Sequence, residues 1–165
     1  MIRIAPLASE HRARVEAIVR ATGVFSDDEV NVALEVVDEA LATSADYRLV
    51  GAFDGDLVVG YAAYGPTPCC DGTFDLYWIA TDPAHQHVGV GTLLLSEVER
   101  RIAGDFARML VVETSSRSDY APTRGFYGRR GYTEAARVRE FYAPDDDRII
   151  FTKQFQQHSP IRRGA

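Results

Sequence analysis

The sequence predicts an α/β fold in which helices cover both faces of a mixed β-sheet. Runs rich in β-branched and aromatic residues alternate with segments whose apolar residues recur every three or four positions. One apolar run, at residues 73–80, is nearly continuous, which is typical of a strand at the centre of a sheet. The length of 165 residues is enough to bury a sizeable core. We therefore expect a single domain over residues 1–155, followed by a flexible tail at residues 156–165 that has no apolar periodicity.

The first half of the chain combines a short strand, two helices and a hairpin. Ser26 and Glu29 have the spacing of a capping box, and apolar residues at helical spacing follow them. Asp54-Gly55 separates two β-rich runs and predicts a tight hairpin turn. In chain order, the expected elements are a strand at residues 2–4, helices at 10–21 and 27–42, and strands at 47–53, 57–64 and 73–80.

The second half alternates helices with strands and ends in another hairpin. Gly131 follows a short helical segment and is placed to end it as a C′ glycine. Three consecutive aspartates, residues 145–147, are expected at a water-exposed hairpin tip. The expected elements are helices at residues 93–102 and 123–130, and strands at 109–112, 132–142 and 148–155. The complete order is β-α-α-β-β-β-α-β-α-β-β.

The composition argues against several classes of protein. A net charge of −6 disfavours nonspecific binding of nucleic acid, which needs a basic surface. No apolar stretch is long enough to span a bilayer, and the N-terminus lacks the features of a signal peptide. The two cysteines, Cys69 and Cys70, are adjacent and cannot build a disulfide framework. We therefore expect a cytoplasmic protein that binds neither nucleic acid nor membrane.

The most informative segment joins the apolar strand at residues 73–80 to the helix that follows. It reads Thr81-Asp82-Pro83, then a short polar turn, then Gln86-x-x-Gly89-x-Gly91. Glycines let the backbone turn sharply and bring its N–H groups close to a ligand. The first turn of the next helix adds unpaired N–H groups and the positive end of the helix dipole. Residues 86–92 are therefore predicted to form a cradle for a phosphorylated ligand.

A second motif further along the chain supports a family resemblance. It reads Tyr120-Ala-Pro-Thr123-Arg124-Gly-Phe126-Tyr127-Gly-Arg-Arg-Gly131-Tyr132. It is similar to the Asn-x-x-Ala-x-x-(Leu/Phe)-Tyr-x-x-x-Gly-(Phe/Tyr) helix of the GNAT superfamily of acyl-CoA N-acyltransferases. The glycine motif and the order of elements resemble the same superfamily, so the resemblance covers essentially the whole chain. It implies a mostly antiparallel sheet of about seven strands.

The resemblance implies acetyl-CoA as a co-substrate and indicates which residues would bind it. Main-chain groups of Ile79, Ala80 and Thr81 would contact the pantetheine arm. The pyrophosphate would lie among Gln86, His87, Val88, Gly89, Val90, Gly91 and Thr92. Two departures from the family pattern stand out. His87 and Val88 replace residues that are often basic, so the cradle must work chiefly through its backbone. Tyr120 replaces the usual Asn, so the side-chain amide contact to pantetheine would be lost or replaced by a phenol.

Acetylation of an amine requires a base, a donor for the oxyanion and an acid. Free alkyl amines have pKa values near 10.4, so most are protonated at neutral pH and must lose a proton before they attack a thioester. A backbone N–H at Ile79 or Ala80 is a candidate for stabilising the oxyanion. The departing thiolate has a reference pKa of about 8.5 and can take a proton from a phenol with a pKa of about 10. The resemblance places this acid at Tyr127.

Two carboxylates are candidates for the general base. Glu113 ends a buried strand, at a position used as the base in some members of the family, including protein N-terminal acetyltransferases. Asp75 matches the carboxylate of histone-type members, and strict alternation would place Asp75, Tyr77 and Ile79 on one face of the sheet. Either carboxylate could instead be solvated or paired with an arginine, and a water relay could replace a single base.

The sequence thus predicts an N-acetyltransferase that moves the acetyl group of acetyl-CoA directly to a primary amine of a small-molecule or amino-acid-like acceptor. Two alternatives stay open: acetylation of a protein N-terminus or lysine, and a non-catalytic acyl-CoA-binding sensor or interaction domain. No metal is expected, because His85-x-His87 has no third ligand at a suitable spacing. Arg124, Arg129 and Arg130 are expected to face solvent, and the alternative is that they reach the phosphates of coenzyme A from the second-motif helix. Members of the family often form dimers, so a homodimer also stays open.

Overall fold

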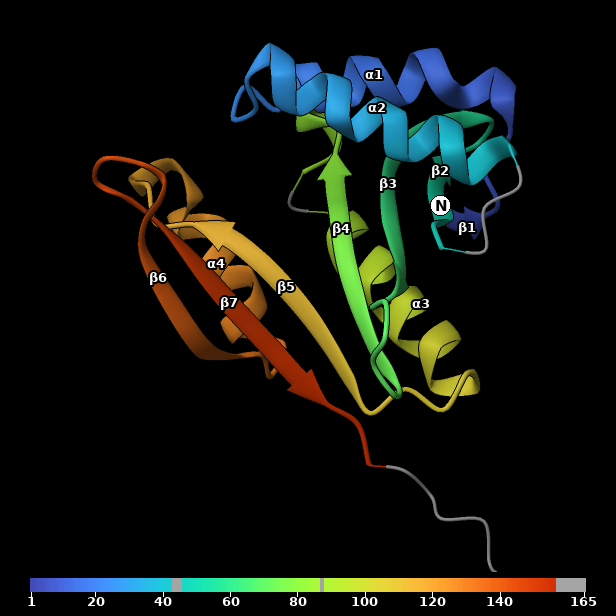
Figure 1. The fold of residues 1–165 in the computed structure, drawn as a ribbon. Coiled ribbons are helices and arrows are strands. Elements are labelled where there is room, and N and C mark those ends of the chain that lie inside the picture. The colour runs from blue at the N-terminus through green and yellow to red at the C-terminus, as the bar shows by residue number, and fades with distance from the viewer. Residues whose placement is uncertain (43–45, 87, 157–165) are drawn as a thin grey trace, which may run out of the picture.

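The computed structural model describes residues 1–42, 46–86 and 88–156. His87 and the predicted tail beyond residue 156 lie outside the described residues. The strands form one seven-stranded sheet in the order β1-β2-β3-β4-β5-β7-β6, in which β4 and β5 are parallel and the other neighbouring pairs are antiparallel (Figure 1). This mostly antiparallel sheet, with helices on both faces, confirms the predicted fold class.

The elements follow the predicted order. They are β1 (Ile2–Ala5), η1 (Ser9–His11), α1 (Arg12–Ala21), α2 (Asp27–Ala42), β2 (Arg48–Asp54), β3 (Leu57–Pro66), β4 (Thr73–Thr81), η2 (Pro83–His85), α3 (Val90–Gly104), β5 (Met109–Ser115), η3 (Ser118–Tyr120), α4 (Ala121–Gly128), β6 (Thr133–Ala143) and β7 (Asp146–Gln154).

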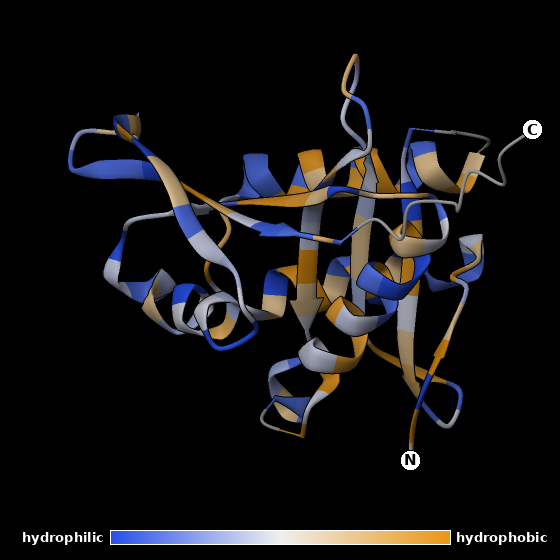
Figure 2. Cartoon of the chain, turned by 90° about the horizontal axis from the view of Figure 1, so that it is seen from below, coloured by the Kyte–Doolittle hydropathy of each residue, from blue (hydrophilic) through white to orange (hydrophobic). Residues whose placement is uncertain are grey.

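Each face of the sheet carries its own part of the core. On the face that we call the α1/α2 face, those two helices bury their apolar stripes against β2, β3 and β4 (Figure 1). On the opposite α3/α4 face, α3 covers β2 to β4, and α4 lies against β5 and β7. Figure 2 shows the hydrophobic colour concentrated along the central strands. Among the helices that the structure describes, we find none with the length and apolar character needed to cross a bilayer.

Two local predictions are confirmed in detail. The capping box at the start of α2 forms, because the Ser26 N–H donates to Oε2 of Glu29 at 2.7 Å and the Glu29 N–H donates to Oγ of Ser26 at 3.3 Å. The hairpin between β2 and β3 turns at Gly55, whose φ of 59° lies in the left-handed region.

The two motif helices begin earlier than predicted. α3 begins at Val90 rather than at residue 93, because Gly89 already serves as its N-cap. α4 begins at Ala121 rather than at residue 123, since Pro122 is tolerated in the first turn of a helix. The first turns of both helices therefore lie inside the motifs themselves.

A bulge in β4 changes which of its side chains share a face. Tyr77 is an extra residue relative to β3. As a result Tyr77 and Trp78 both pack on the α1/α2 face, whereas Ile79 packs on the α3/α4 face. The prediction that Asp75, Tyr77 and Ile79 share one face is therefore wrong for Ile79, because a bulge breaks the period-two alternation of a strand.

β4 and β5 start side by side and then diverge (Figure 1). Their pairing ends where Leu76 lies opposite Val112. Beyond this point β4 is paired with β3 and β5 with β7. We call the opening between residues 77–81 of β4 and residues 113–115 of β5 the wedge. Its two edges carry backbone N–H and C=O groups that face no partner strand in the described sheet, so the wedge can pair with an extended ligand.

Gly60 sets how closely α3 approaches the sheet. A β-carbon at this position of β3 would lie 2.9 Å from Cγ1 of Val90, 3.0 Å from the carbonyl oxygen of Ala80 and 3.1 Å from Cδ1 of Leu94. Val90 is the first residue of α3, so the missing side chain of Gly60 positions the start of this helix beside the end of β4.

We expect Gly60→Ala to lower the free energy of unfolding by about 1–3 kcal/mol, because overpacking forces α3 away from β3. Urea unfolding followed by circular dichroism measures this change. Gly104→Ala is the matched control, since a β-carbon there meets nothing within 4 Å and the residue is helical. The control should keep or raise the stability. Equal stability of Gly60→Ala and the wild type would contradict this packing argument.

Candidate active site

The backbone of β4 directs hydrogen-bonding groups into the wedge at alternate residues. The N–H of Asp82 donates to the carbonyl of Val59 on β3 at 2.9 Å. Hydrogen-bonded pairs in an antiparallel ladder alternate with pairs whose N–H and C=O groups point away. Ala80 is therefore bonded to β3, whereas the backbone groups of Ile79 and Thr81 point into the wedge. Of the two predicted oxyanion donors, this geometry favours Ile79.

The glycine motif forms the start of α3. Gly89 has a φ of 89°, in the left-handed region where a β-carbon is strained, and it is the N-cap of the helix. The N–H of Leu93 donates to the carbonyl of Gly89 at 3.0 Å, which is the first bond of the helical ladder. The N–H groups of residues 90–92 precede this bond, so they are available to an anion together with the positive end of the helix dipole.

Gly91 has a different role from the one predicted. It lies in the first turn of α3 and does not have a positive φ, so the sharp turn depends on Gly89. A β-carbon at Gly91 would lie 3.3 Å from Cε2 of Phe126 and 3.8 Å from Oγ1 of Thr81. The missing side chain therefore lets α4 pack its aromatic residue directly against the start of α3.

Arg130 brings a fixed positive charge to this turn, and the prediction that it faces solvent is wrong. Its guanidinium donates to the hydroxyl of Thr92 and, at 3.0 Å, to the carbonyl of Phe126. It also stacks on the Phe126 ring, 3.7 Å from the ring centroid. Burial and the neighbouring Arg129 lower the pKa of Arg130, but a guanidinium stays charged at physiological pH. The positive charge that the glycine motif lacks is thus supplied from the end of α4.

An ion pair restrains the strand end that leads into the glycine motif. Arg14 of α1 donates to the carbonyl of Val58 at 2.9 Å and to the carboxylate of Asp82. Asp82 also accepts the N–H of Ala84 at 2.9 Å, as the cap of η2. The bond from Ala84 and the contacts with Arg14 hold the pKa of Asp82 below its usual value. α1 therefore fixes the turn from which α3 starts.

The apex of the wedge is the point where the pairing of β4 with β5 ends, and Tyr127 lies there on the α3/α4 face. Its side chain is buried, and its ring lies 6.1 Å from that of Phe151. Phe151 is paired with Val112, the last residue of β5 that pairs with β4. Burial raises the pKa of the Tyr127 phenol above its usual value of about 10, so the group stays protonated at physiological pH. The difference between the pKa of the Tyr127 phenol and that of a thiol is consequently larger than the sequence suggested.

Glu113 lies at the same apex but on the α1/α2 face. It directly follows Val112, whose side chain packs in the α3/α4 core, so alternation turns Glu113 to the other side. Its carboxylate pairs with the guanidinium of Arg148 on β7, and the two side chains are 38% and 26% exposed. Arg148 in turn stacks on the ring of Phe141 on β6, 4.6 Å from its centroid. An arginine partner for this carboxylate was one of the predicted alternatives.

Asp75 lies in the closed half of the β4–β5 pair. It is opposite Val111 of β5, and its carboxylate accepts a hydrogen bond from the hydroxyl of Thr67 at 2.7 Å. Burial and the charge of Asp75 raise the pKa of Tyr77 to about 12. Between the two predicted bases, the structure thus brings Glu113, and not Asp75, to the apex of the wedge.

Tyr120 lies among groups from the α1/α2 side of the molecule. The guanidinium of Arg117 stacks on its ring at 5.1 Å and donates to the carbonyl of Val24, between α1 and α2, at 3.0 Å. Burial and the charge of Glu29 raise the pKa of Tyr120 to about 12. Burial and acidic neighbours also raise the pKa of Tyr142 on β6. The loop between β5 and α4 is thereby tied to the loop between α1 and α2 and lies close to the β6–β7 hairpin.

The three consecutive aspartates do not form a hydrated tip. Asp146 is 6% exposed and accepts hydrogen bonds from the Ser115 hydroxyl at 2.5 Å and the Ser116 N–H at 3.2 Å. The N–H of Asp147 donates to the Ser116 hydroxyl at 2.8 Å. Asp145 is exposed as predicted. The prediction is wrong for Asp146 and Asp147, because Ser115 and Ser116 bond the Asp146 carboxylate and β6 supplies partners for the Asp147 carboxylate.

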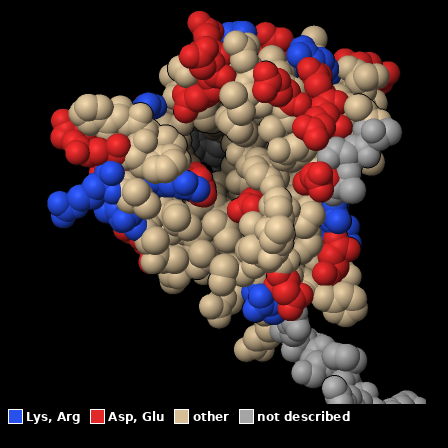
Figure 3. All heavy atoms as spheres, viewed as in Figure 1, with Lys and Arg blue, Asp and Glu red and all other residues tan. Residues whose placement is uncertain are grey.

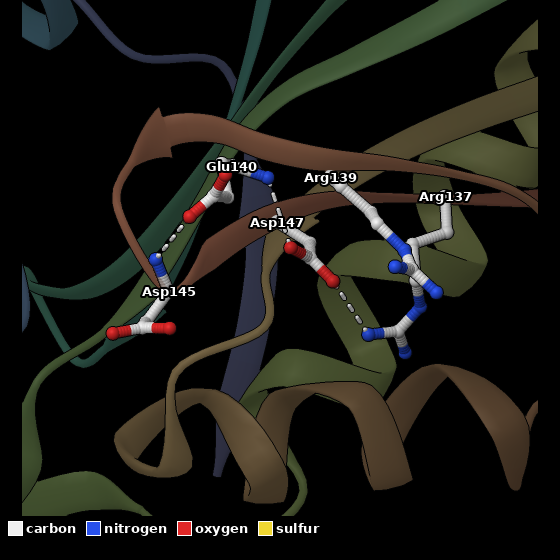
Figure 4. A pocket seen from close by; sticks show the side chains of 5 residues that line it. All are labelled: Arg137, Arg139, Glu140, Asp145 and Asp147. Atoms are coloured by element: carbon white, nitrogen blue, oxygen red, sulfur yellow. Dashed lines mark hydrogen bonds and ion pairs between the residues drawn. The ribbon is translucent and has the colours of Figure 1, made fainter.

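A cavity of about 560 Å³ lies at the β6–β7 hairpin (Figure 4). Asp147 accepts the N–H of Glu140 at 2.9 Å and a guanidinium N–H of Arg137 at 3.0 Å, and these contacts hold its pKa below its usual value. Ile149 packs in the α3/α4 core, so alternation places Asp147 on that face, away from Glu113. The lining residues are Arg137, Arg139, Glu140, Asp145 and Asp147. Opposite charges are paired among these lining residues, and the pairs stabilise the hairpin.

A second hollow opens on the α1/α2 face. Figure 3 shows it between α2, β4 and the β6–β7 hairpin, over the open end of the wedge. Acidic side chains gather on the helices above it. Phe25, between α1 and α2, packs on Trp78 of β4 with ring centroids 6.0 Å apart. The wedge is therefore accessible from a surface that has both aromatic and charged side chains.

Comparison with known proteins decides the family. Residues 45–134, just over half of the chain, match the family described as acetyltransferase (GNAT) domain. The chain belongs to the GNAT family. The predicted family, the GNAT superfamily of acyl-CoA N-acyltransferases, is therefore confirmed.

Solved structures of acetyltransferases share this fold over nearly the whole chain. One from Desulfovibrio desulfuricans, assigned to the GNAT acetyltransferases, is 42% identical with a TM-score of 0.87, and the match covers 93% of this chain and 98% of that one. The ribosomal-protein-S18-alanine N-acetyltransferase of Escherichia coli has a TM-score of 0.78 at 19% identity, covering 97% of this chain and 99% of that one. At this identity the likeness shows the shared fold.

A curated relative matches part of the chain. The N-alpha-acetyltransferase RimI of Mycobacterium tuberculosis is 34% identical over 96 residues, which make up 56% of this chain and 56% of the relative. The match thus spans about half the length of that relative.

The GNAT chain has the groups that coenzyme A requires. The N–H groups in the first turn of α3 and the guanidinium of Arg130 suit a pyrophosphate, and the polar edge of β4 suits the amides of pantetheine. Gln86 and Val88 of the predicted site are exposed beside this turn. Among the described residues, no three His, Cys, Asp or Glu side chains converge as a metal site.

We expect Arg130→Gln to weaken coenzyme A binding by about tenfold or more, because charge-assisted hydrogen bonds to phosphate are lost. Isothermal titration calorimetry with coenzyme A measures the change, and the salt dependence of binding should decrease. Arg100→Gln removes one charge from the exposed side of α3 and should change the affinity less than twofold. Equal affinities of Arg130→Gln and Arg100→Gln would show that the backbone cradle is sufficient.

Proposed function

We propose that this GNAT protein transfers the acetyl group of acetyl-CoA directly to a primary amine of a small or amino-acid-like acceptor, within a ternary complex. One observation carries the proposal: Tyr127 and Glu113 flank the apex of the wedge from opposite faces of the sheet. The donor would enter from the α3/α4 side and the amine from the α1/α2 side. An acid and a base are thereby available on the two sides of the reacting carbonyl.

In this mechanism Glu113 accepts a proton from the ammonium group of the acceptor, directly or through a water molecule. The amine nitrogen forms a bond to the thioester carbonyl carbon, and the carbon–sulfur bond breaks. The N–H of Ile79 stabilises the negative charge that develops on the carbonyl oxygen. Tyr127 gives its proton to the departing thiolate, and the nitrogen loses a second proton as the amide forms, which returns the Tyr127 phenolate to a phenol through water. The proton held by Glu113 passes to solvent, so the products are a free thiol, an amide and one released proton.

The electrostatics of the α1/α2 face suit the protonated amine of the acceptor. The first turn of α2 contains Asp27, Asp28 and Glu29, and acidic side chains gather above the hollow (Figure 3). A negative potential at the entrance raises the local concentration of a protonated amine. The two exposed free thiols, Cys69 and Cys70, support our proposal that the protein works in the reducing cytoplasm.

A protein N-terminus is the second candidate acceptor. It is favoured by the partial match to RimI, whose name describes N-alpha-acetylation. A third reading, a domain that binds acyl-CoA without catalysis, is tested together with these two. Thiol release from acetyl-CoA is measured with a panel of small amines, peptides and proteins. Tight coenzyme A binding without thiol release from any acceptor would leave the non-catalytic reading.

We expect Glu113→Gln to lower kcat/KM by about 10²- to 10⁴-fold, because general-base catalysis is lost. Steady-state thiol release measures the rate, and calorimetry checks that coenzyme A still binds. Asp75→Asn is the comparison, since Asp75 lies in the closed half of the strand pair and should matter far less. A larger loss in Asp75→Asn than in Glu113→Gln would reverse the assignment of the base.

We expect Tyr127→Phe to lower kcat by about 10- to 100-fold while coenzyme A binding is kept, since only the phenolic proton is removed. Comparable melting temperatures of the variant and the wild type exclude unfolding as the cause. Unchanged turnover would show that Tyr127 is not the acid.

The raised pKa of Tyr127 predicts a pH profile without an early alkaline fall. A phenol whose pKa is raised keeps its proton below that pKa, so it stays a competent acid up to at least pH 10. The rate should rise as the acceptor amine loses its proton and should not decline between pH 8 and pH 10. The measurement is kcat over this range for the wild type and for Tyr127→Phe. A decline near pH 9 that disappears in Tyr127→Phe would contradict the raised pKa.

A further inference from the structure

The ion pair between Glu113 and Arg148 places a cation beside the carboxylate proposed as the base. Both side chains lie on the α1/α2 face, since Arg148 is opposite Ser115 and follows the same alternation as Glu113. The pair is only partly exposed, at 38% for Glu113 and 26% for Arg148. A half-buried pair of this kind balances two charges that would each be costly alone.

Arg148 keeps unused hydrogen-bonding capacity. One terminal nitrogen contacts Glu113, and the Nε atom is buried without a hydrogen-bond partner among the described residues. A guanidinium has five N–H donors arranged to bind a carboxylate through two parallel bonds. Phe141 lies over its plane at 4.6 Å and restricts where the guanidinium can move.

The segment that holds Phe141 is itself fixed. The register between β6 and β7 shifts after Val138, and Glu140 has a φ of 49°, so the strand bulges there. Asp147 accepts the N–H of Glu140 and a guanidinium N–H of Arg137, which anchors the bulge. The aromatic residue is thereby held against Arg148.

Neighbouring arginines are already committed to other partners. Arg117 pairs with Asp119 and donates to the carbonyl of Val24. Arg124 donates to the carbonyls of Ser115 and Arg117 at 2.8 Å. Arg148 is therefore the arginine best placed to bind an anionic group next to Glu113.

We propose that Arg148 binds the carboxylate of the acceptor and that the acceptor is a free α-amino acid. This proposal deepens the proposed function and rests on it. The ammonium group of such an acceptor takes the place of Arg148 beside Glu113, and its carboxylate takes the place of Glu113 beside Arg148. Both side chains therefore keep a partner of opposite charge when the amino acid binds. An amine without a carboxylate would instead leave Arg148 charged and uncompensated, which costs binding free energy.

The exchange also prepares the base. When the carboxylate of the acceptor binds Arg148, the guanidinium releases Glu113, and the freed carboxylate oxygens can accept the ammonium proton. Arg148 acts as a specificity and positioning residue in this scheme, since the proton moves from the ammonium group to Glu113. No bond of the acetyl transfer is formed or broken at Arg148.

The test compares free amino acids with their carboxamides, which keep the amine and lose the negative charge. For the wild type we expect kcat/KM to be at least tenfold higher for the acids, as the loss of a charge-assisted contact predicts. In Arg148→Gln the preference should fall to less than threefold, mainly through a higher KM for the acids. Arg139→Gln is the matched control, because Arg139 lies in the separate cavity of the hairpin and should leave the preference unchanged (Figure 4).

Binding gives a readout that does not depend on turnover. Free amino acids and their carboxamides are titrated into the wild type, Arg148→Gln and Arg148→Lys, with coenzyme A in place of acetyl-CoA so that no acetyl group is transferred, and melting temperatures are checked. Tighter binding of the acids that is lost in Arg148→Gln supports the proposal, even if no tested amine is acetylated. Equal binding of acids and amides by the wild type, or a preference that survives in Arg148→Gln, overturns it. Faster acetylation of amides or peptides than of amino acids overturns it as well and leaves acetyl transfer itself intact.

Discussion

The divergence of β4 from β5 after Leu76 is the constraint on which the rest of the molecule depends. Two parallel strands that stayed paired to their ends would satisfy each other's backbone and leave no edge for a ligand. The bulge at Tyr77 interrupts the regular register of β4 at the point where the pairing with β5 stops. β5 is meanwhile held by β7 over its whole length. Both strands are thus anchored on their outer sides, and the opening between them is a stable part of the fold.

The two helices of the α3/α4 face, α3 and α4, pack closely on the two sides of this opening. Gly60 lets α3 approach β3, and Gly91 lets Phe126 approach α3. Arg130 then joins the end of α4 to the first turn of α3 through Thr92. The anion-binding N–H groups and the phenol of Tyr127 are therefore positioned by one set of close contacts, which extends from the strand to both helices.

Local patterns predicted the fold class, the element order and the α2 capping box, because each depends on residues near one another in the chain. The bulge in β4 was missed, since nothing in an apolar run distinguishes a regular strand from one with an extra residue. The burial of Asp146 was missed, and the position of Arg130 was only the alternative to solvent exposure, for another reason. Their partners, Ser115 and Thr92, lie 31 and 38 residues away in the sequence, so these contacts exist only once the chain has folded. The paired arginines at the end of the second motif were the one local signal of a charge near the phosphate turn.

Amino-acid substitutions in β6 affect the stability of the fold less than substitutions in the core do. Every residue of β6 is exposed, yet this strand carries Phe141, which lies over Arg148 at the entrance that we propose for the acceptor. Substitutions on an exposed edge strand usually change the folding free energy little, whereas those in the core are costly. Natural variation can therefore reshape the surface that meets the amine while α3, Gly89 and Tyr127 are kept for the shared donor. A single architecture built in this way can diversify in the amines that it accepts without losing the ability to fold.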